Sequence, residues 1–559
     1  TWTEEKTFTD KVKRKVQEQF LAICLERKYD KAYILENYLN TINLGSGCWG
    51  VQAASMRYFN KDVSDLTLSE CAVLAAITKN PSGYSPLNYP KDCRKRQILV
   101  LDRMLDQGYI DKATYKKAKK DKVFARIAEN ENNQELNGIF SYYEDAMLEQ
   151  LVDDLSLKLA ISEDDAWQMI YRGGLTICSS MDSNLQSILE NEINDLDNYD
   201  SQEYFGEEND AEKGQGIQAS GVIMDYSTGE VLAIVGGRGQ KKASLIFNRA
   251  TDRARQPGST IKIPGEYALG LEEGEITLGT VFDDAYYTYS DGTEVNNADH
   301  LFKGMTTIQD AIIESRNVSA VKLARDLGIQ NVYDNLTKDD CIEALALGGT
   351  YNGVTNLELT SAYGTIANGG LANSTKYYTM VYDQDQKVIL DVYDLDATDD
   401  GNRIVSYETA AQLTSAMELV LTEGTGTDAW FDGCAIAGKS GTTNDFKDIW
   451  FVGYSPYYVC GIWTGYDDYT SQNSSYSSKK IWREVMEQAN ENLGNAAFDM
   501  ENSLASVKIC TKCGLLAEEG LCEVTDQGDM TDYVAYVYGT APTTYCDCHE
   551  KVEICTESG

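Results

Sequence analysis

A glycine-rich stretch in the last third of the chain, GCAIAGKSGTTNDF (433–446), contains a lysine that could bind an anion in two ways. Its spacing matches G-x-x-x-x-G-K-[ST], the loop in which backbone amides and the lysine hold the phosphates of a nucleotide. Lys439, Ser440 and Gly441 also match the K-[ST]-G element of enzymes built on an S-x-x-K serine nucleophile. In that second chemistry the lysine would face the carboxylate of a substrate that acylates a serine.

The residues that follow Lys439 exclude the nucleotide interpretation. A phosphate loop requires a helix that begins at its Lys-Ser pair, because the helix N-terminus supplies the amides and the dipole that hold the anion. Here the chain continues as GTTNDFKDIWFVGYSP, which is rich in Gly, Thr and aromatic residues and has no helical period. This composition predicts a strand, so we expect no nucleotide ligand.

The serine chemistry needs a serine and a lysine one helical turn apart, so that the amine can take the hydroxyl proton. Three pairs have this S-x-x-K spacing: Ser259 and Lys262, Ser319 and Lys322, and Ser477 and Lys480. The first pair follows a Pro-Gly turn in RQPGSTIKIP, where a loop leads into a helix and leaves the serine amide free. Ser319 is expected within a helix and Ser477 in a serine-rich loop, so both are expected to be packing or surface residues.

Two further features favour a serine that is activated by lysine. An S-x-N element, Ser315 and Asn317 in IIESRNVSA, lies between the other two elements along the chain. The chain has two histidines, His300 and His549, and the second belongs to a cysteine cluster. A Ser-His-Asp triad would therefore depend on His300, which is expected in the loop NNADHLFKG. A lysine base is the simpler route to an activated serine.

Composition limits the class of protein and its partners. At 559 residues the chain is expected to form about two to four domains. The difference between 49 basic and 88 acidic residues gives a net charge of −39. So acidic a surface repels polyphosphate, and nucleic acid is not an expected partner. The sequence contains no run of eighteen apolar residues and no signal peptide, so no segment of it is expected to span a bilayer.

Periodicity and composition divide the chain into four parts. Residues 1–118 carry apolar side chains at helical spacing and are expected to be all-α. Residues 119–215 are acidic and mixed, and are expected to be a linker region with short helices and a strand. From GIQASGVIMDYSTGEVLAIVGG onward, a β-hairpin, helices and aromatic strands predict an α+β domain over residues 216–495. Residues 496–559 form a Cys-rich C-terminal extension.

The C-terminal extension holds six of the fourteen cysteines: Cys510, Cys513, Cys522, Cys546, Cys548 and Cys555. A disulfide framework or a zinc site could explain such a cluster. The spacings match no established zinc pattern, and the family resemblance described next places the chain outside the cytoplasm. We therefore expect disulfides here and assign no metal ligand.

The three motifs, with the text around them, resemble the transpeptidase domain of class A penicillin-binding proteins, which are bifunctional peptidoglycan glycosyltransferases and D,D-transpeptidases. The resemblance extends to SGVIMDYSTGEVLAIVGG, NRATDRARQPGSTIK, ALALGGTYNGVTNLELTSAYGTIANGG and IAGKSGTTNDFKDIWFVGYSP. Near the N-terminus RKVQE, KAYILENYLN and LTLSECAVLAA resemble the glycosyltransferase domain of the same family. The resemblance covers the chain to about residue 490.

The resemblance implies a multidomain protein. Its parts would be an all-α, lysozyme-like glycosyltransferase domain of family 51 type, a penicillin-binding transpeptidase domain with an antiparallel sheet flanked by helices, and a small Cys-rich tail. Arg14, Lys15 and Glu18 would belong to the glycosyltransferase site. Because the family's first catalytic glutamate precedes RKVQE, and only TWTEEKTFTDKVK does so here, we expect an N-terminally truncated, incomplete glycosyltransferase domain and a missing membrane anchor. The implied location is the extracytoplasmic side of the cell membrane.

The resemblance also implies roles in the cross-linking of peptidoglycan. Ser259 would be the acylated nucleophile and Lys262 its base, kept neutral by burial and by the nearby Lys439. Ser315 would pass the proton to the leaving D-alanine, and Asn317 would orient the amide of the donor peptide. The terminal carboxylate is expected to bind Lys439 and the residues after it: Ser440, Gly441, Thr442 and Thr443. The backbone amides of Ser259 and Thr442 would form the oxyanion hole.

The implied partners are peptidoglycan stem peptides, lipid II and β-lactam antibiotics. No cofactor is expected for the transpeptidase, whereas the intact glycosyltransferase could use a divalent cation. Pro264, two residues after Lys262, removes one helical hydrogen bond to residue 260 and should perturb the helix there. Two alternatives stay open: a D,D-carboxypeptidase or β-lactamase in which water deacylates the serine, and a non-catalytic penicillin-binding sensor.

Overall fold

The chain divides into two units in the computed structural model: residues 1–139 with 161–175, and residues 140–160 with 176–559. The structure describes residues 8–45, 48–81, 83–87, 89–127, 139–200, 216–328, 330, 332, 346–349, 352–395 and 402–551. Among the described helices, none is both long enough and apolar enough to cross a membrane.

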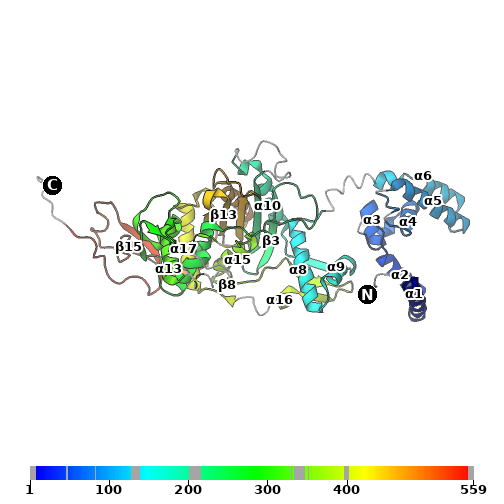
Figure 1. Ribbon diagram of the computed structural model, residues 1–559, viewed down its shortest axis with the longest axis horizontal. Coiled ribbons are helices and arrows are strands. Elements are labelled where there is room, and N and C mark those ends of the chain that lie inside the picture. The colour runs from blue at the N-terminus through cyan, green and yellow to red at the C-terminus, as the bar shows by residue number, and fades with distance from the viewer. Residues whose placement is uncertain are drawn as a thin grey trace. The chain divides into compact units, whose positions relative to one another are not determined.

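The first unit is helical, as its periodicity predicts (Figure 1). Its described elements are α1 (Phe8–Lys28), α2 (Lys31–Thr41), α3 (Val51–Phe59), η1 (Val63–Asp65), α4 (Leu68–Ile77), α5 (Pro90–Asp106), α6 (Lys112–Lys120) and α9 (Glu163–Arg172). Helix α4 begins with a capping box between Thr67 and Glu70. The buried Glu70 carboxylate also accepts hydrogen bonds from Lys61 at 3.1 Å and Arg126 at 3.0 Å. This residue therefore ties the start of the buried helix to two neighbouring segments.

The RKVQE segment lies within α1. Lys15 is exposed, whereas the side chains of Arg14 and Glu18 lie outside the described part of the structure. Their assignment to a glycosyltransferase site therefore stays a prediction.

A five-stranded antiparallel sheet organises the second unit. Its strands are, in spatial order, β12 (Ala437–Thr442), β13 (Asp448–Tyr454), β14 (Val459–Gly465), β2 (Gln218–Asp225) and β3 (Glu230–Val235). The β2–β3 pair is the hairpin predicted around YSTGE. More than two hundred residues separate this hairpin from the other three strands along the chain. In the spatial order, β12 is the edge strand on one side of the sheet and β3 is the edge strand on the other.

Helices cover both faces of this sheet. Helix α15 (Asn356–Ala367) packs on one face, and α10 (Ser183–Asn194) and α18 (Ser477–Asn490) pack on the other. Successive side chains of β13 point to opposite faces of the sheet and pack in the two different cores, as the period of two in a strand requires. Trp450 joins the core that includes α15, whereas Phe451 joins the core that includes α18. The predicted α+β class, with an antiparallel sheet flanked by helices, is confirmed.

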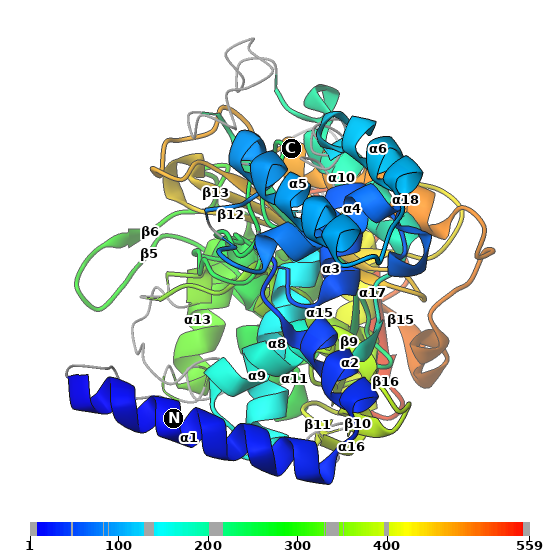
Figure 2. The same cartoon turned by 90° about the vertical axis from the view of Figure 1, so that its right-hand side faces the viewer.

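Further elements surround this core. They are α8 (Tyr142–Leu159), β1 (Thr176–Ser179), η2 (Leu196–Asn198), η4 (Gly258–Lys262), η5 (Ile263–Tyr267), α11 (Ala268–Glu272), β4 (Val281–Asp284), β5 (Tyr287–Thr288), β6 (Glu294–Val295), β7 (Gly304–Thr307), α12 (Ile308–Ile313), α13 (Asn317–Leu327), β8 (Leu371–Ala372), β9 (Tyr378–Tyr382), β10 (Val388–Asp391), α16 (Val392–Leu395), β11 (Asn402–Arg403), α17 (Tyr407–Thr422), η7 (Thr427–Ala429), η8 (Asn444–Phe446), η9 (Asp499–Ser503), β15 (Leu504–Cys510) and β16 (Thr531–Val537). Residues 119–215, expected as a linker region, supply α8, β1 and α10 to the second unit. The β5–β6 hairpin projects from this unit (Figure 2).

The C-terminal extension folds onto the core of the second unit through an antiparallel hairpin, β15–β16. Ile509, Val534 and Tyr536 of this hairpin are buried among residues of α12 and α17. The extension is therefore part of the second unit and not a separate body.

The described cysteines of the extension are free thiols. The Cys546 and Cys548 sulfurs are 3.3 Å apart, whereas a disulfide bond is about 2.05 Å long. The expectation of disulfides is therefore wrong for the described cysteines, and Cys555 lies outside the described residues. The physical reason is geometric, because the hairpin and the loops after it gather the thiols around one centre instead of in separate pairs.

Replacing Gly461 by alanine is expected to destabilise the second unit by about 1–3 kcal/mol. A Cβ atom added to this β14 residue would lie 2.1 Å from Thr360 Oγ1 and 2.6 Å from Asn356 Oδ1. These two atoms share a buried hydrogen bond on α15, so the helix must move away from the sheet. Urea unfolding followed by tryptophan fluorescence measures the loss.

Gly364→Ala, at the same interface between helix and sheet, is the matched control. Its added Cβ would lie 3.3 Å from Tyr226 and 3.4 Å from Val459, which is close to ordinary contact. Alanine also gains about 1 kcal/mol of helix propensity over glycine. Equal destabilisation by the two substitutions would contradict the close approach of Gly461 to α15.

Candidate active site

Ser259 and Lys262 lie on a short helix of unusual type. The segment η4 is a 3-10 helix, and the following η5 is a π-helix with Gly265 at φ −85° and ψ −112°. Pro264 explains the irregularity, because its ring nitrogen cannot donate a helical hydrogen bond. Side chains three residues apart eclipse one another in a 3-10 helix, so Ser259 and Lys262 project from the same side.

The backbone before Ser259 packs directly against β12. Gly258 has φ +54°, and a Cβ atom at this position would lie 2.8–2.9 Å from the backbone of Thr442. A side chain at position 258 would therefore push the two segments apart. Glycine lets the amide of Ser259 approach the end of the strand that carries the Lys-Ser-Gly element.

Two aromatic side chains hold this turn on the sheet core. Trp450 on β13 donates its indole N–H to the carbonyl oxygen of Gln256 at 2.9 Å. Tyr363 on α15 donates its hydroxyl to the carbonyl oxygen of Thr260 at 2.7 Å. Ser259, which is partly exposed, lies between these two fixed carbonyl groups.

The S-x-N element brings both lysines together. Ser315, between α12 and α13, has φ +58°, a left-handed conformation that is uncommon outside glycine. Lys262 Nζ donates to the Ser315 carbonyl oxygen at 2.9 Å and to Asn317 Oδ1 at 2.7 Å. Lys439 Nζ donates to Ser315 Oγ at 2.8 Å. The structure thus brings the predicted elements into one constellation around Ser315.

Burial sets the protonation of both lysines, whose side chains are completely buried. Burial lowers the pKa of Lys262 to about 7, with a contribution from the positive charge of Arg316. Burial also lowers the pKa of Lys439, and the neighbouring charge of Lys262 adds to this effect. The site therefore favours a neutral amine at physiological pH, which a proton acceptor requires.

The residues after Lys439 continue β12 and the turn beyond it. Ser440 Oγ lies 2.8 Å from Thr425 Oγ1, and a Cβ on Gly441 would lie 2.5 Å from the carbonyl oxygen of Pro257. Thr443 follows the strand and lines a cavity of about 280 Å³ with Gln256, Arg255, Asp448 and other residues. The strand expected after Lys439 is confirmed, so a phosphate loop cannot form here.

Comparison with known proteins finds three matching family models. These are "Transglycosylase" over residues 2–105, "Penicillin binding protein transpeptidase domain" over 219–487 and "Penicillin-binding protein 1A, C-terminal domain" over 500–551. Penicillin-binding protein 1A of Clostridium botulinum is 33% identical over 97% of this chain and 67% of its own length. The chain belongs to the class A penicillin-binding proteins. Its function is peptidoglycan synthesis, with one transglycosylase and one transpeptidase domain.

Solved structures support the same fold. Penicillin-binding protein 1A of Haemophilus influenzae has a TM-score of 0.70 at 22% identity, covering 93% of this chain and 92% of its own. PonA1 of Mycobacterium tuberculosis, solved in complex with penicillin V, has a TM-score of 0.53 at 23% identity over 64% of this chain and 95% of its own. No finding favours the alternative carboxypeptidase, β-lactamase or sensor functions.

Glu266 is a residue of this penicillin-binding protein that the motifs do not reveal. Its side chain is completely buried, and apart from its own backbone amide neither carboxyl oxygen has a hydrogen-bond partner among the described residues. Burial raises its pKa to about 8, and the negative form would raise the pKa of Lys262. Glu266 follows Lys262 by four residues, so helical spacing in the sequence could have identified it as a neighbour of that lysine.

Arg316, the middle residue of the S-x-N element, holds the turn through a buried ion pair. Its Nε and Nη2 atoms donate to Asp284 Oδ2 at 2.9 and 2.7 Å, and Nη1 donates to Asp299 Oδ2 at 2.7 Å. Asp284 is fully buried, whereas the Asp299 side chain is 41% exposed. Because these partners lie 17 to 32 residues away along the chain, spacing alone could not identify them.

Other candidate residues lie apart from this constellation. Ser319 is buried within α13, as expected. Ser477 is buried as the first residue of α18, so its expected placement in a loop is wrong. The serine-rich loop ends just before it, because the following residues pack on the sheet. His300 is exposed in the loop where it was expected.

Asp284→Asn is expected to destabilise the second unit by about 3 kcal/mol. The substitution removes the buried negative charge that balances Arg316, and an uncompensated buried charge is costly. Thermal or urea unfolding measures the loss.

Asp299→Asn is the control, because it removes the more exposed carboxylate from the same arginine. Its cost is expected to stay below about 1 kcal/mol. A larger loss for Asp299→Asn than for Asp284→Asn would contradict the buried ion pair as the anchor of the turn.

Proposed function

We propose that this chain is a serine D,D-transpeptidase that cross-links stem peptides through an acyl-enzyme on Ser259. The observation that carries the proposal is the hydrogen-bonded contact of two buried lysines with the Ser315–Asn317 turn, beside the helix that bears Ser259. An amine with its pKa lowered to about 7 can take a hydroxyl proton at neutral pH.

In the first step Lys262, as the neutral amine, takes the proton of Ser259. The serine oxygen then forms a bond to the carbonyl carbon of the penultimate D-alanine of the donor. The bond from this carbon to the nitrogen of the terminal D-alanine breaks, and that nitrogen needs a proton. Ser315 Oγ supplies it, and the proton that Lys262 took from Ser259 replaces it by way of Lys439, whose Nζ lies 2.8 Å from Ser315 Oγ.

The oxyanion of the tetrahedral intermediate is proposed to lie between the backbone amides of Ser259 and Thr442. The close packing of Gly258 on the Thr442 backbone supports this pairing of segments. Each such donor typically contributes about 3 kcal/mol to the transition state. The hydroxyl groups of Ser440 and Thr442, with Lys439, would bind the terminal carboxylate, and Gly441 and Thr443 would complete this strand-side contact.

Besides orienting the amide of the donor, Asn317 contacts other residues of this chain. Its Oδ1 accepts a hydrogen bond from Lys262, and its Nδ2 donates to the carbonyl oxygen of Asn296 at 2.7 Å. These contacts support a function in aiming the amine of Lys262. An amine acceptor from a second stem peptide then attacks the acyl carbon, the bond from this carbon to Ser259 Oγ breaks, and a proton from the amine returns to Ser259 as the cross-link forms.

The proposed partners follow from the same site and from the family. PonA1, a structural neighbour, was solved with penicillin V, and we propose that β-lactams acylate Ser259 here. Lipid II is the proposed substrate of the transglycosylase domain, for which a divalent cation stays a prediction. The transpeptidase chemistry uses no cofactor, nucleotide or nucleic acid. Class A proteins are membrane-associated with catalytic domains outside the cell, and we propose this location for the chain.

Ser259→Ala is expected to abolish covalent labelling by a fluorescent penicillin, because the acylated hydroxyl is lost. Ser319→Ala is the matched control: it removes a buried serine from another S-x-x-K pair and should leave labelling unchanged. Labelling intensity on a denaturing gel gives the result. Equal labelling of the two variants would remove the assignment of the nucleophile.

Acylation is expected to accelerate as the pH rises through about 7 and then to level off. The reason is that the base must be neutral, and the pKa of Lys262 is lowered from 10.5 to about 7. An ordinary lysine would keep the rate rising toward about pH 10. Rates of penicillin acylation measured between pH 5 and 10 distinguish the two profiles.

Glu266→Gln should move the pH profile of penicillin acylation to lower pH, because the ionised carboxylate of Glu266 raises the pKa of Lys262. Glu273→Gln changes an exposed glutamate at the end of α11 and should leave the profile unchanged. A shift to higher pH in Glu266→Gln would contradict the proposed coupling between the two buried groups.

A further inference from the structure

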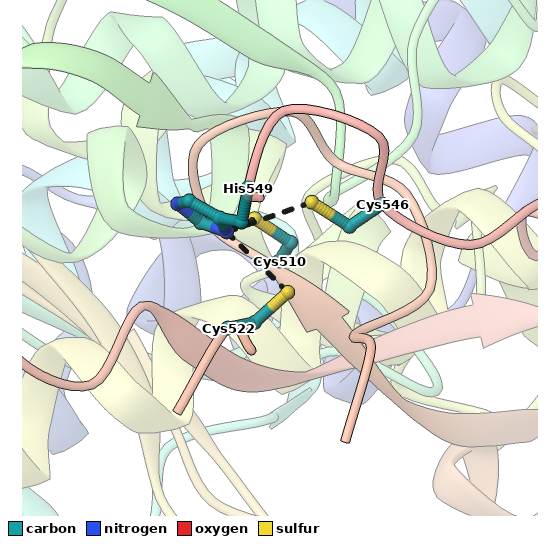
Figure 3. Close-up of side chains that lie close together, drawn as sticks. All are labelled: Cys510, Cys522, Cys546 and His549. Atoms are coloured by element: carbon teal, nitrogen blue, oxygen red, sulfur yellow. Dashed lines mark hydrogen bonds between the residues drawn. The ribbon is translucent and has the colours of Figure 1, made fainter. Parts of the chain in front are cut away.

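Three segments of the C-terminal extension converge on one cluster of metal-ligating side chains (Figure 3). Cys510 ends β15, Cys522 lies in the turn that follows, and Cys546 and His549 belong to the last described loop. The three sulfurs and one imidazole nitrogen lie within 4.8 Å of one another. The cluster belongs to a part of the chain that the serine chemistry does not use.

The distances match those of a tetrahedral metal site. His549 Nδ1 lies 3.8 Å from Cys510 Sγ, 3.6 Å from Cys546 Sγ and 3.5 Å from Cys522 Sγ. Zinc bonds of about 2.3 Å to sulfur and about 2.0 Å to nitrogen, at tetrahedral angles, separate these atoms by about 3.5 Å. The imidazole nitrogen therefore lies at the spacing expected if it shares one ion with the three sulfurs, and all four atoms lie within 4.8 Å of one another.

The surroundings of the cluster suit thiolates. Cys510 and Cys522 are completely buried, and Cys546 is 8% exposed. The backbone amide of Glu518 donates to Cys522 Sγ at 3.3 Å. Such N–H donors stabilise negative sulfur and orient it, a role that groups around a metal commonly have.

We propose that Cys510, Cys522, Cys546 and His549 bind one Zn²⁺ ion. As the ion binds, each cysteine thiol releases a proton to solvent and His549 binds as the neutral imidazole, so no redox step is involved. Four protein ligands leave no position for a substrate, and the ion is structural. Its effect is to lock the loops that flank the β15–β16 hairpin.

A second set of four, Cys510, Cys513, Cys546 and Cys548, shares two of these residues. Two zinc-bound sulfurs are separated by about 3.8 Å. In this set Cys510 and Cys548 are 4.0 Å apart, but Cys546 and Cys548 are only 3.3 Å apart, which is too close for two ligands of one ion. Cys513 and Cys548 are therefore assigned as neighbours of the site and not as ligands. They provide matched controls, because each is a cysteine beside the same centre.

The site is coupled to the transpeptidase core. On the hairpin that carries Cys510, Ile509 and Tyr536 are buried in that core, and Gln309 of α12 donates to Asp532 Oδ2 at 3.0 Å. Loss of the ion should therefore loosen the covering of α12, the helix that leads to Ser315.

Metal analysis of the full chain tests the proposal. Protein purified without chelator in the presence of Zn²⁺ is expected to retain about one ion per chain after desalting. Cys522→Ser and His549→Ala should reduce the bound zinc at least about tenfold, whereas the double variant Cys513→Ser/Cys548→Ser should retain it. His549→Cys, which restores a ligand, should regain zinc. Removal of the ion from the unmodified chain should lower its unfolding temperature.

Cobalt substitution keeps the test decisive if a variant fails to fold. Co²⁺ added to the metal-free, unmodified chain should give the visible absorption of a tetrahedral, thiolate-bound ion. Zinc lost from the double variant but kept in Cys522→Ser would assign the ion to the other set and overturn the proposal. A zinc-free chain whose mass shows disulfides among these cysteines would overturn it as well.

Discussion

The burial of two lysine amines around one serine is the constraint on which the active site depends. Two ammonium ions cannot both be retained in a space that water does not enter, because each loses its hydration and repels the other. Lys262 and Lys439 therefore compete for charge. Ser315 accepts a hydrogen bond from each, through its carbonyl oxygen from Lys262 and through Oγ from Lys439. For the proposed serine nucleophile, the arrangement provides a neutral base without any histidine.

Burying charged groups costs free energy, and neighbouring residues of opposite charge compensate for part of this cost. The buried arginine beside Ser315 is neutralised by Asp284, so the turn carries no uncompensated positive charge of its own. Glu266 adds a buried acid whose pKa is raised to about 8. The left-handed backbone of Ser315 is held in place by the same turn. Strain and buried charge are thus concentrated at the reacting centre, while regular sheet and helix packing supplies stability elsewhere.

Local sequence patterns predicted the three motifs, the strand after Lys439 and the α+β class, because each depends on residues that are neighbours in the chain. The partners that make those motifs work come from far away. Asp284 faces Arg316 across 32 residues, and the contact of Gly258 with Thr442 spans most of the domain. Such contacts have no periodic signal. The cysteine tail shows the same limit. The sequence indicated a cysteine cluster and led to an expectation of disulfides, whereas the gathering of the thiols around His549 depends on the folded hairpin.

The place of β12 at the end of the five-stranded sheet has a consequence for selectivity. A terminal strand has one side that no neighbouring strand of its own sheet occupies, and an extended peptide can pair with such a side through its main chain. Recognition of this kind depends on the backbone conformation of the peptide more than on its side chains. For the proposed transpeptidase, pairing of this kind would align a linear, extended donor with Ser259 and would disfavour folded chains of the same composition.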